Sequence, residues 1–276
     1  MGYRERKAFK DILNDLGLTT GLQLCLDAGD ILSYDGTNAT WFDRSPSDAD
    51  FWLGSISGAD ANDPTFVGTA GDLKDTTYWS HSGTTFFTNI NGTAGTPWLE
   101  NFHKANAKLT LVYWFNPTNA AAATQYIFST ALNAVQTGFQ FYFGATSIIR
   151  ITVQNGASTV LDVLSTLTVK QSDAWQMVAL SVDEAGNSGI FHINGQSETF
   201  AAAYASPSGG ASSSGATLGA RNVAGTGALR ANTRTGAFLA WNRALSAAEL
   251  LSLWQYPGVA FTTAAKSNRA VKVMGY

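Results

Sequence analysis

The chain has very little cysteine, proline or charge. Among its 276 residues there are one cysteine and six prolines, and 13% of the residues are Asp, Glu, Lys or Arg. A single cysteine excludes an intramolecular disulfide. Cys25 lies among Leu22, Leu24 and Leu26, an alternation typical of a strand, so we expect a buried and inert thiol.

Long apolar runs are also missing. The N-terminal segment 1–7 lacks the apolar stretch of a signal peptide. No stretch approaches the roughly 18 apolar residues that a membrane-spanning helix needs. We therefore expect a chain that folds in the cytoplasm and does not insert into a membrane.

Positive charge is scarce except at the two ends. Residues 1–10 hold four basic groups and one acid, residues 266–276 hold three basic groups and no acid, and residues 11–265 hold ten basic groups and nineteen acids. This acidic body argues against a nucleic-acid groove. The basic ends predict arms that contact a neighbouring molecule; the alternative is that their charges are only solvated.

Glycine and aromatic residues are plentiful and favour β-structure. The 27 Gly, 16 Phe, 9 Tyr and 8 Trp are typical of many short strands joined by tight turns. The 45% hydrophobic content is enough for the core of one large domain. The expected strands are Gly21–Asp27, Leu109–Phe115, Tyr126–Thr130, Gly138–Gly144, Ile148–Gln154, Thr159–Leu164, Gln176–Val182, Ile190–Ile193, Thr217–Ala220 and Ala237–Trp241.

Two Asn-Gly pairs predict tight hairpins in this series. Asn155-Gly156 and Asn194-Gly195 suit two-residue type I′ turns, in which both positions require a positive φ. Short strands at this spacing predict an all-β fold, an antiparallel two-sheet jelly-roll β-sandwich.

A short helix is expected on each side of the sandwich. Phe9, Ile12, Leu13 and Leu16 recur at helical spacing within residues 4–16, and so short a helix needs its apolar stripe docked on the sandwich or on another subunit. Near the C-terminus, Ser246 and Glu249 have the capping-box spacing. Leu250, Leu253 and Trp254 then share one helical face. The expected organisation is an N-terminal helical arm (1–19), a sandwich (20–256) and a basic C-terminal tail (257–276).

Three parts of the chain resemble one family. They are Leu26-Asp-Ala-Gly-Asp30 with Ser33-Tyr34 and Trp41-Phe-Asp-Arg-Ser45; Leu109–Pro117 with Trp175–Leu180 and Phe191–Gln196; and Gly236–Glu249. Together they resemble the concanavalin A-like lectin/glucanase superfamily in its laminin G-like form, as found in tailed-phage structural proteins. The resemblance covers roughly residues 20–256. It departs at Asn194-Gly195, where many members have Asp-Gly, and residues 48–102 match no part of the family pattern.

The resemblance implies the fold but no single activity, because the superfamily holds glucanases, lectins, adhesion modules and virion proteins. We expect a non-enzymatic phage virion protein, a capsid decoration, head fibre or tail component, that is assembled in the host cytoplasm and displays a lectin-like sandwich to glycans. Its expected partners are other virion proteins, further copies of itself and a host-surface glycan. The alternatives are a free carbohydrate-binding protein and a glycoside hydrolase. The candidate assembly contacts are Arg4, Arg6, Lys7, Phe9, Lys10, Ile12, Leu13, Leu16, Lys266, Arg269 and Lys272.

Catalytic patterns are missing from the sequence. Glucanases of this fold carry Glu-x-Asp-x-Glu on one strand, which aims the carboxyl groups at one cleft, whereas the expected strands 138–143, 148–154, 176–182 and 190–193 contain no carboxylate. His81, His103 and His192 lack the spacing of a zinc site, and no Gly-x-Ser-x-Gly is present. We expect no catalytic residues.

The loop-rich segment 45–102 holds the candidate binding residues. Tyr78, Trp79 and Trp98 offer rings that stack on sugars and Asn91 offers an amide; the alternative for each ring is core packing. Asp60, Asn62 and Asp63 offer oxygen ligands for calcium, the one metal cofactor we expect, although Thr65 stands where an EF-hand needs glycine. The alternative is that these are solvated turn residues.

Overall fold

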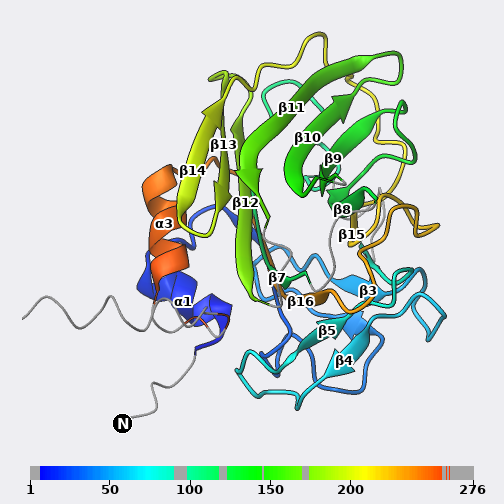
Figure 1. Cartoon of the computed structure of the whole chain (residues 1–276), viewed down its shortest axis with the longest axis vertical. Helices are drawn as coiled ribbons and strands as arrows, with labels where there is room; N and C mark the ends of the chain where they lie inside the picture. Colours follow the sequence, from blue (N-terminus) through cyan, green and yellow to red (C-terminus); the bar gives the residue numbers. More distant parts are fainter. Residues whose placement is uncertain are drawn as a thin grey trace, which may run out of the picture.

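The computed structural model describes residues 7–89, 98–117, 123–144, 146–169 and 174–256, together with residues 259 and 261. Two antiparallel sheets pack face to face (Figure 1), which confirms the predicted jelly-roll sandwich. Among the described residues, no helix is both long and apolar enough to span a bilayer.

The first sheet carries the two helices. Its strand order is β14 (Gln196–Phe200), β13 (Ser188–Ile193), β12 (Gln176–Asp183), β7 (Lys108–Asn116), β16 (Arg234–Trp241), β5 (Tyr78–Ser80) and β4 (Thr65–Val67), with β1 (Leu22–Asp27) also paired to β16. The second sheet runs in the order β11 (Thr159–Thr168), β10 (Ile148–Gln154), β9 (Gly138–Phe143), β8 (Gln125–Ser129), β15 (Thr217–Leu218), β6 (Phe87–Asn89), β3 (Phe51–Leu53) and β2 (Thr40–Trp41).

The main core lies between the sheets and is rich in aromatic rings. Phe115 of the first sheet meets Phe143 of the second with ring centroids 5.8 Å apart, and Phe238 stacks on Phe128 at 6.0 Å. These residues alternate along their strands with residues of the opposite face, so each strand contributes every second side chain to this core.

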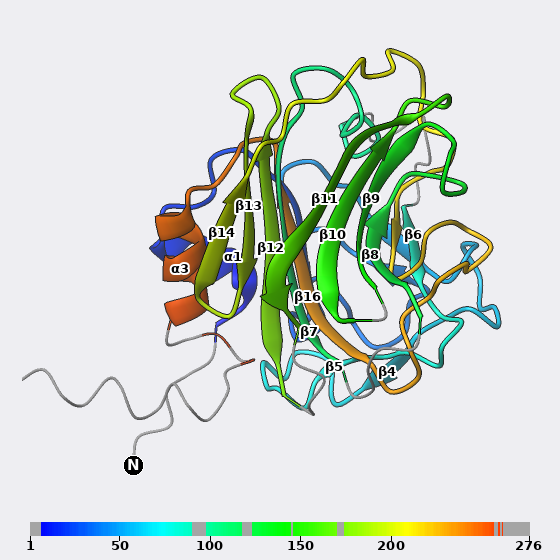
Figure 2. The ribbon, with the colours of Figure 1, turned by 45° about the horizontal axis from the view of Figure 1, so that its top comes forward.

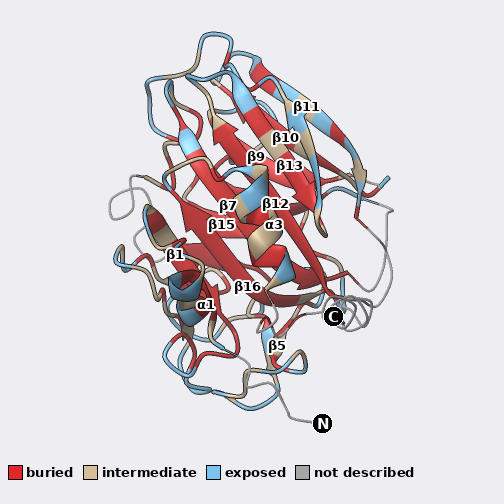
Figure 3. Ribbon diagram, turned by 90° about the vertical axis from the view of Figure 1, so that its left-hand side faces the viewer, coloured by how far each residue is buried: buried red, intermediate tan, exposed pale blue. Residues whose placement is uncertain are grey.

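A second apolar cluster covers the outer face of the first sheet. Helices α1 (Phe9–Asp15) and α3 (Ala247–Gln255) lie on that face (Figures 2 and 3). Trp254 of α3 stacks on Trp114 of β7 at 5.4 Å. Phe9, Ile12 and Leu13 are buried in the same cluster, so the apolar stripe of the N-terminal helix docks on its own sandwich.

The predicted capping box is confirmed at the start of α3. The Glu249 amide donates to Ser246 Oγ at 3.3 Å, and the Ser246 amide donates to Glu249 Oε2 at 2.8 Å. The first turn of α3 therefore has side-chain partners for amides that the helix itself cannot satisfy.

Both predicted hairpins form, but only one has the predicted two-residue turn. Asn194 and Gly195 have φ of 50° and 90°, as a type I′ turn between β13 and β14 requires. Four residues, 155–158, connect β10 to β11 instead of two. Asn155 Oδ1 accepts from the Ala157 and Ser158 amides, so the two-residue prediction was wrong there because this side chain organises a longer turn.

Candidate functional site

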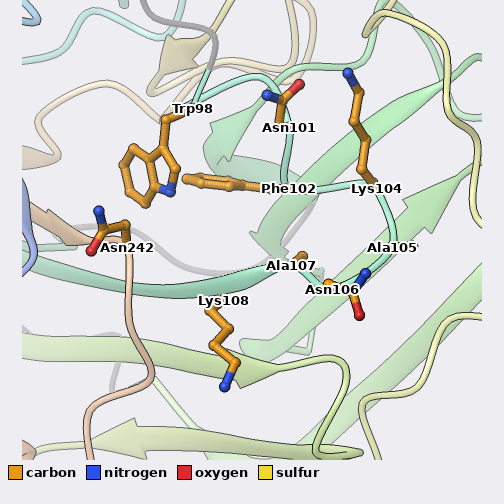
Figure 4. Close-up of a pocket in the computed structure, with 9 residues that line it drawn as sticks. All are labelled: Trp98, Asn101, Phe102, Lys104, Ala105, Asn106, Ala107, Lys108 and Asn242. Carbon is orange, nitrogen blue, oxygen red and sulfur yellow. The ribbon is translucent and has the colours of Figure 1, made fainter.

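A cleft of about 480 Å³ opens at the end of the sandwich where β7 begins and β16 ends (Figure 4). This volume lies in the range of small-molecule sites. Its lining comes mostly from the segment that leads into β7, and consists of Trp98, Asn101, Phe102, Lys104, Ala105, Asn106, Ala107, Lys108 and Asn242.

Trp98 is the one large, partly exposed aromatic side chain of this lining. Its ring meets the Phe102 ring edge-on with centroids 4.7 Å apart. Phe102 is buried and packs against Phe128 and Phe139 of the second sheet, each at 5.4 Å. The indole therefore rests on the core while part of its surface remains open to the cleft.

The rest of the segment is tied to the sandwich by hydrogen bonds. Tyr204 Oη donates to the Phe102 carbonyl at 3.0 Å, and His103 Nε2 donates to the Gly210 carbonyl at 3.1 Å. Burial lowers the pKa of His103, so its ring stays neutral near pH 7. Further along the chain, the backbone amide of Asn106 donates to Glu184 Oε2 at 2.6 Å. These contacts hold the lining in place before any ligand arrives.

The polar groups of the cleft suit a hydroxyl-rich ligand. Asn101, Asn106 and Asn242 each offer an amide that can donate and accept. Lys108 Nζ lies 2.9 Å from a carboxylate oxygen of Asp183, and Asp183 is not one of the lining residues. None of the nine described lining residues is a carboxylate, so these residues supply no acid pair of the kind that cleaves glycosidic bonds.

The four residues predicted to bind glycans do not come together. Trp98 lines the cleft, whereas Trp79 is fully buried, 5.7 Å from Trp41 in the main core, which is the packing alternative. Tyr78 is partly buried beneath the Arg234 guanidinium, 5.1 Å away. Tyr78 is on β5 and lies level with Phe115 near the far end of β7, about 20 Å along the strand direction from the cleft. Asn91 lies outside the described residues.

Sequence reasoning missed the polar half of the cleft. Asn101 and Asn106 look like ordinary turn residues, and Asn242 looks like a strand end. The order of the strands did contain one indication. In an antiparallel pair, the start of β7 and the end of β16 must lie at the same edge of the sheet, as Thr110 opposite Trp241 does. Polar residues that flank those two ends are therefore neighbours in space.

The predicted calcium ligands form a local hydrogen-bonded turn. Asp60 Oδ2 accepts from the Ser55 amide at 2.9 Å, and its Oδ1 accepts from the Asn62 amide at 2.5 Å. Asp63 Oδ2 accepts from the Asp60 amide, but Asp63 Oδ1 is buried without a donor. The part of the chain that the structure describes holds no group of three His, Cys, Asp or Glu arranged for a metal. A calcium site here stays a prediction.

The predicted assembly residues separate into buried and charged sets. Phe9, Ile12 and Leu13 are buried, and Leu16 packs beside them. Lys7 is exposed and pairs with Asp15 at 2.6 Å, while Lys10 is partly buried. The remaining basic candidates, Arg4, Arg6, Lys266, Arg269 and Lys272, lie outside the described residues.

A two-sheet sandwich of this topology has the fold of lectin-like domains. The model of the concanavalin A-like lectin/glucanases superfamily, in its laminin G form, matches residues 91–251, more than half of the chain. The chain belongs to this superfamily. A search of curated proteins finds no match.

Solved structures of similar fold include toxin binding domains. The binding domain of botulinum neurotoxin DC in complex with SialylT is 12% identical with a TM-score of 0.52. A structure of botulinum neurotoxin type C, whose cell entry depends on two ganglioside molecules, is 10% identical with a TM-score of 0.54. Each comparison covers 86% of this chain and 51% of the other. The chain thus spans about half the length of these proteins, and the likeness concerns the fold alone.

Proposed function

We propose that this protein is a non-enzymatic glycan-binding module and that the Trp98 cleft is its binding site. The observation that carries the proposal is the partly exposed indole of Trp98, held edge-on by the buried Phe102 beside a cleft with three asparagine amides. An aromatic surface contacts the apolar face of a sugar ring, and amides bind its hydroxyl groups.

Three observations support binding without catalysis. Glycoside hydrolysis usually needs two carboxyl groups about 5 to 10 Å apart, and the lining of the cleft provides none. On the outward face of the second sheet, Asp162 is held in an ion pair by Arg150. The similar toxin domains are binding domains by description, which agrees with this function.

A glycan array tests the proposal directly. Wild-type protein is expected to retain a subset of glycans that Trp98→Ala no longer retains. Tyr78→Ala is the matched control, because Tyr78 is also a partly buried aromatic residue but lies about 20 Å away, near the far end of β7. Equal binding by Trp98→Ala and wild type would place the site elsewhere.

We further propose that the module is displayed on a phage-like particle through its basic ends. The rings of Phe9 and Phe261 stack with centroids 6.3 Å apart, so the first and last described parts of the chain lie together on the outer face of the first sheet. The basic residues beyond them can then meet one acidic partner. The alternative is a free lectin-like protein.

Charge reversal is the suitable test of display, because deleting α1 would remove the buried side chains Phe9, Ile12 and Leu13. Changing Arg4, Arg6, Lys266, Arg269 and Lys272 to glutamate is expected to remove the protein from purified particles, as counted by mass spectrometry. Glycan binding by the free variant should be unchanged. Unaltered incorporation would contradict attachment through the ends.

A further inference from the structure

The outward face of the second sheet carries a pair of tyrosines. Tyr126 of β8 lies opposite Tyr142 of β9, and Tyr142 lies opposite Arg150 of β10. The two rings have centroids 4.9 Å apart. Because Phe141 and Phe143 point into the core, Tyr142 between them points away from it.

An arginine lies over each of these rings, and the two arginines differ in their partners. The Arg150 guanidinium carbon is 5.8 Å from the Tyr142 centroid, and that of Arg221 is 5.6 Å from the Tyr126 centroid. Arg150 is engaged by both carboxylate oxygens of Asp162, with Nε 2.5 Å from Oδ1. Arg221 has no carboxylate partner among the described residues, and its Nε is buried without an acceptor. A buried, charged donor without an acceptor is costly.

The loop that carries Arg221 is held firmly. Asn222 Oδ1 accepts from the Ala224 amide at 3.0 Å, and Asn222 Nδ2 donates to the Leu132 carbonyl at 2.6 Å. The Tyr126 amide donates to the Gly227 carbonyl at 3.0 Å. A side chain on Gly227 would clash with the Tyr126 ring, because a Cβ there would lie 2.7 Å from it. Arg221 is thus fixed over Tyr126 by its own loop.

We propose that this face is a second ligand site, which binds the anionic group of an acidic saccharide through the Arg221 guanidinium. Arg221 is only partly buried, and a carboxylate or phosphate oxygen is the natural acceptor for the guanidinium N–H groups beyond its buried Nε. Tyr126 and Tyr142 are themselves buried and form the floor beneath the two guanidinium groups. Leu132 and Val223, which are 42% and 44% exposed on the two loops joined by Asn222, supply apolar surface for the sugar ring.

The site is distinct from the Trp98 cleft in position and in chemistry. Tyr126 and Tyr142 lie on the outward face of the second sheet, whereas the cleft opens at the end of the first sheet, where β7 begins. Asp162 neutralises Arg150. Of the two arginines that lie over the tyrosine rings, Arg221 is therefore the one that can bind an external anion.

The test is a titration, followed by NMR and calorimetry, with methyl glucuronide, glucose 6-phosphate, methyl glucoside and inorganic phosphate. Wild type is expected to bind the two acidic sugars and to bind methyl glucoside and inorganic phosphate more weakly by about tenfold or more. Arg221→Gln is expected to lose about tenfold or more in affinity for both acidic sugars. Arg221→Lys should recover part of that loss, because it keeps the charge without the fork.

Two controls make the outcome decisive. Asp162→Asn frees Arg150 and is expected to strengthen binding of the acidic sugars, which a general loss of folding could not produce. Trp98→Ala is expected to leave it unchanged, so failure of the glycan cleft and failure of this site are distinguishable. Equal affinities for wild type and Arg221→Gln would overturn the proposal, and inorganic phosphate binding as tightly as glucose 6-phosphate would overturn its saccharide part.

Discussion

The edge of Trp98 rests on Phe102 at a centroid separation of 4.7 Å, and of the two rings Phe102 is the one that is fully buried. This relationship joins the cleft to the core. The energy that orders the indole comes from packing Phe102 against Phe128 and Phe139, so binding and stability are coupled at this position.

Replacing Phe102 should therefore affect both properties. Phe102→Ala is expected to lower the free energy of unfolding by about 3 to 5 kcal/mol, as measured in urea, because it leaves a cavity under Trp98. Glycan binding should weaken as the indole loses its support. Phe102→Leu should cost less in both measurements; full binding by a folded Phe102→Ala protein would show that the support is unnecessary.

Acid should destabilise the protein through His192. Burial lowers the pKa of His192 from 6.5 to about 4. In the neutral ring, Nε2 accepts the Gly195 amide at 3.1 Å and Nδ1–H donates to Ser197 Oγ at 2.8 Å. The folded-state pKa lies below the unfolded value, so this stability is present above about pH 6.5 and is lost as the pH falls towards 4. The difference in urea midpoint between wild type and His192→Gln is expected to shrink as the pH falls from 6.5 to 4. A difference that does not change with pH would contradict the lowered pKa of His192.

Asp27 should act in the opposite direction. Burial raises its pKa from 3.8 to about 7, although it accepts the Phe9 and Gly29 amides, each at 2.9 Å. The stability that Asp27 contributes to the folded state is fully present below about pH 3.8 and is lost as the pH rises through 7. The stability difference between wild type and Asp27→Asn is therefore expected to move against wild type from pH 5 to pH 8. A difference that does not vary with pH would refute the raised pKa.

Calcium is predicted to raise the melting temperature through the Asp60–Asp63 turn. Burial raises the pKa of Asp63, and its Oδ1 has no donor, so a cation can stabilise it. Asp63→Asn should abolish the increase, while Asp75→Asn, which changes an acid of another turn, should preserve it. An unchanged melting temperature at millimolar calcium would contradict a calcium site at this turn.

The sequence predicted the sandwich better than it predicted the site. Alternation and Asn-Gly turns are local signals, so strands such as β10 (Ile148–Gln154) and the capped α3 were expected where the structure has them. Trp79 and Trp98 look alike in the sequence, yet one is in the core and the other lines the cleft. That difference depends on long-range packing, which no local pattern records.

The role of Asn155 shows the same limit at a smaller scale. Its side chain caps a four-residue turn, whereas Asn194 adopts the positive φ of a two-residue turn. Both precede glycine, and only the strand registers distinguish the two turns, because Gln154 pairs with Thr159 whereas Ile193 pairs with Gln196. Arg221 was likewise invisible as a site residue, because only the fold places it over Tyr126.

Glycan binding by the Trp98 cleft is tested most directly by the affinity of one array-selected glycan for wild type, Trp98→Ala and Tyr78→Ala, measured by calorimetry at neutral pH. Trp98→Ala is expected to weaken binding by about tenfold or more, while Tyr78→Ala binds like wild type and both variants stay folded. Undiminished binding by Trp98→Ala would contradict binding at this cleft.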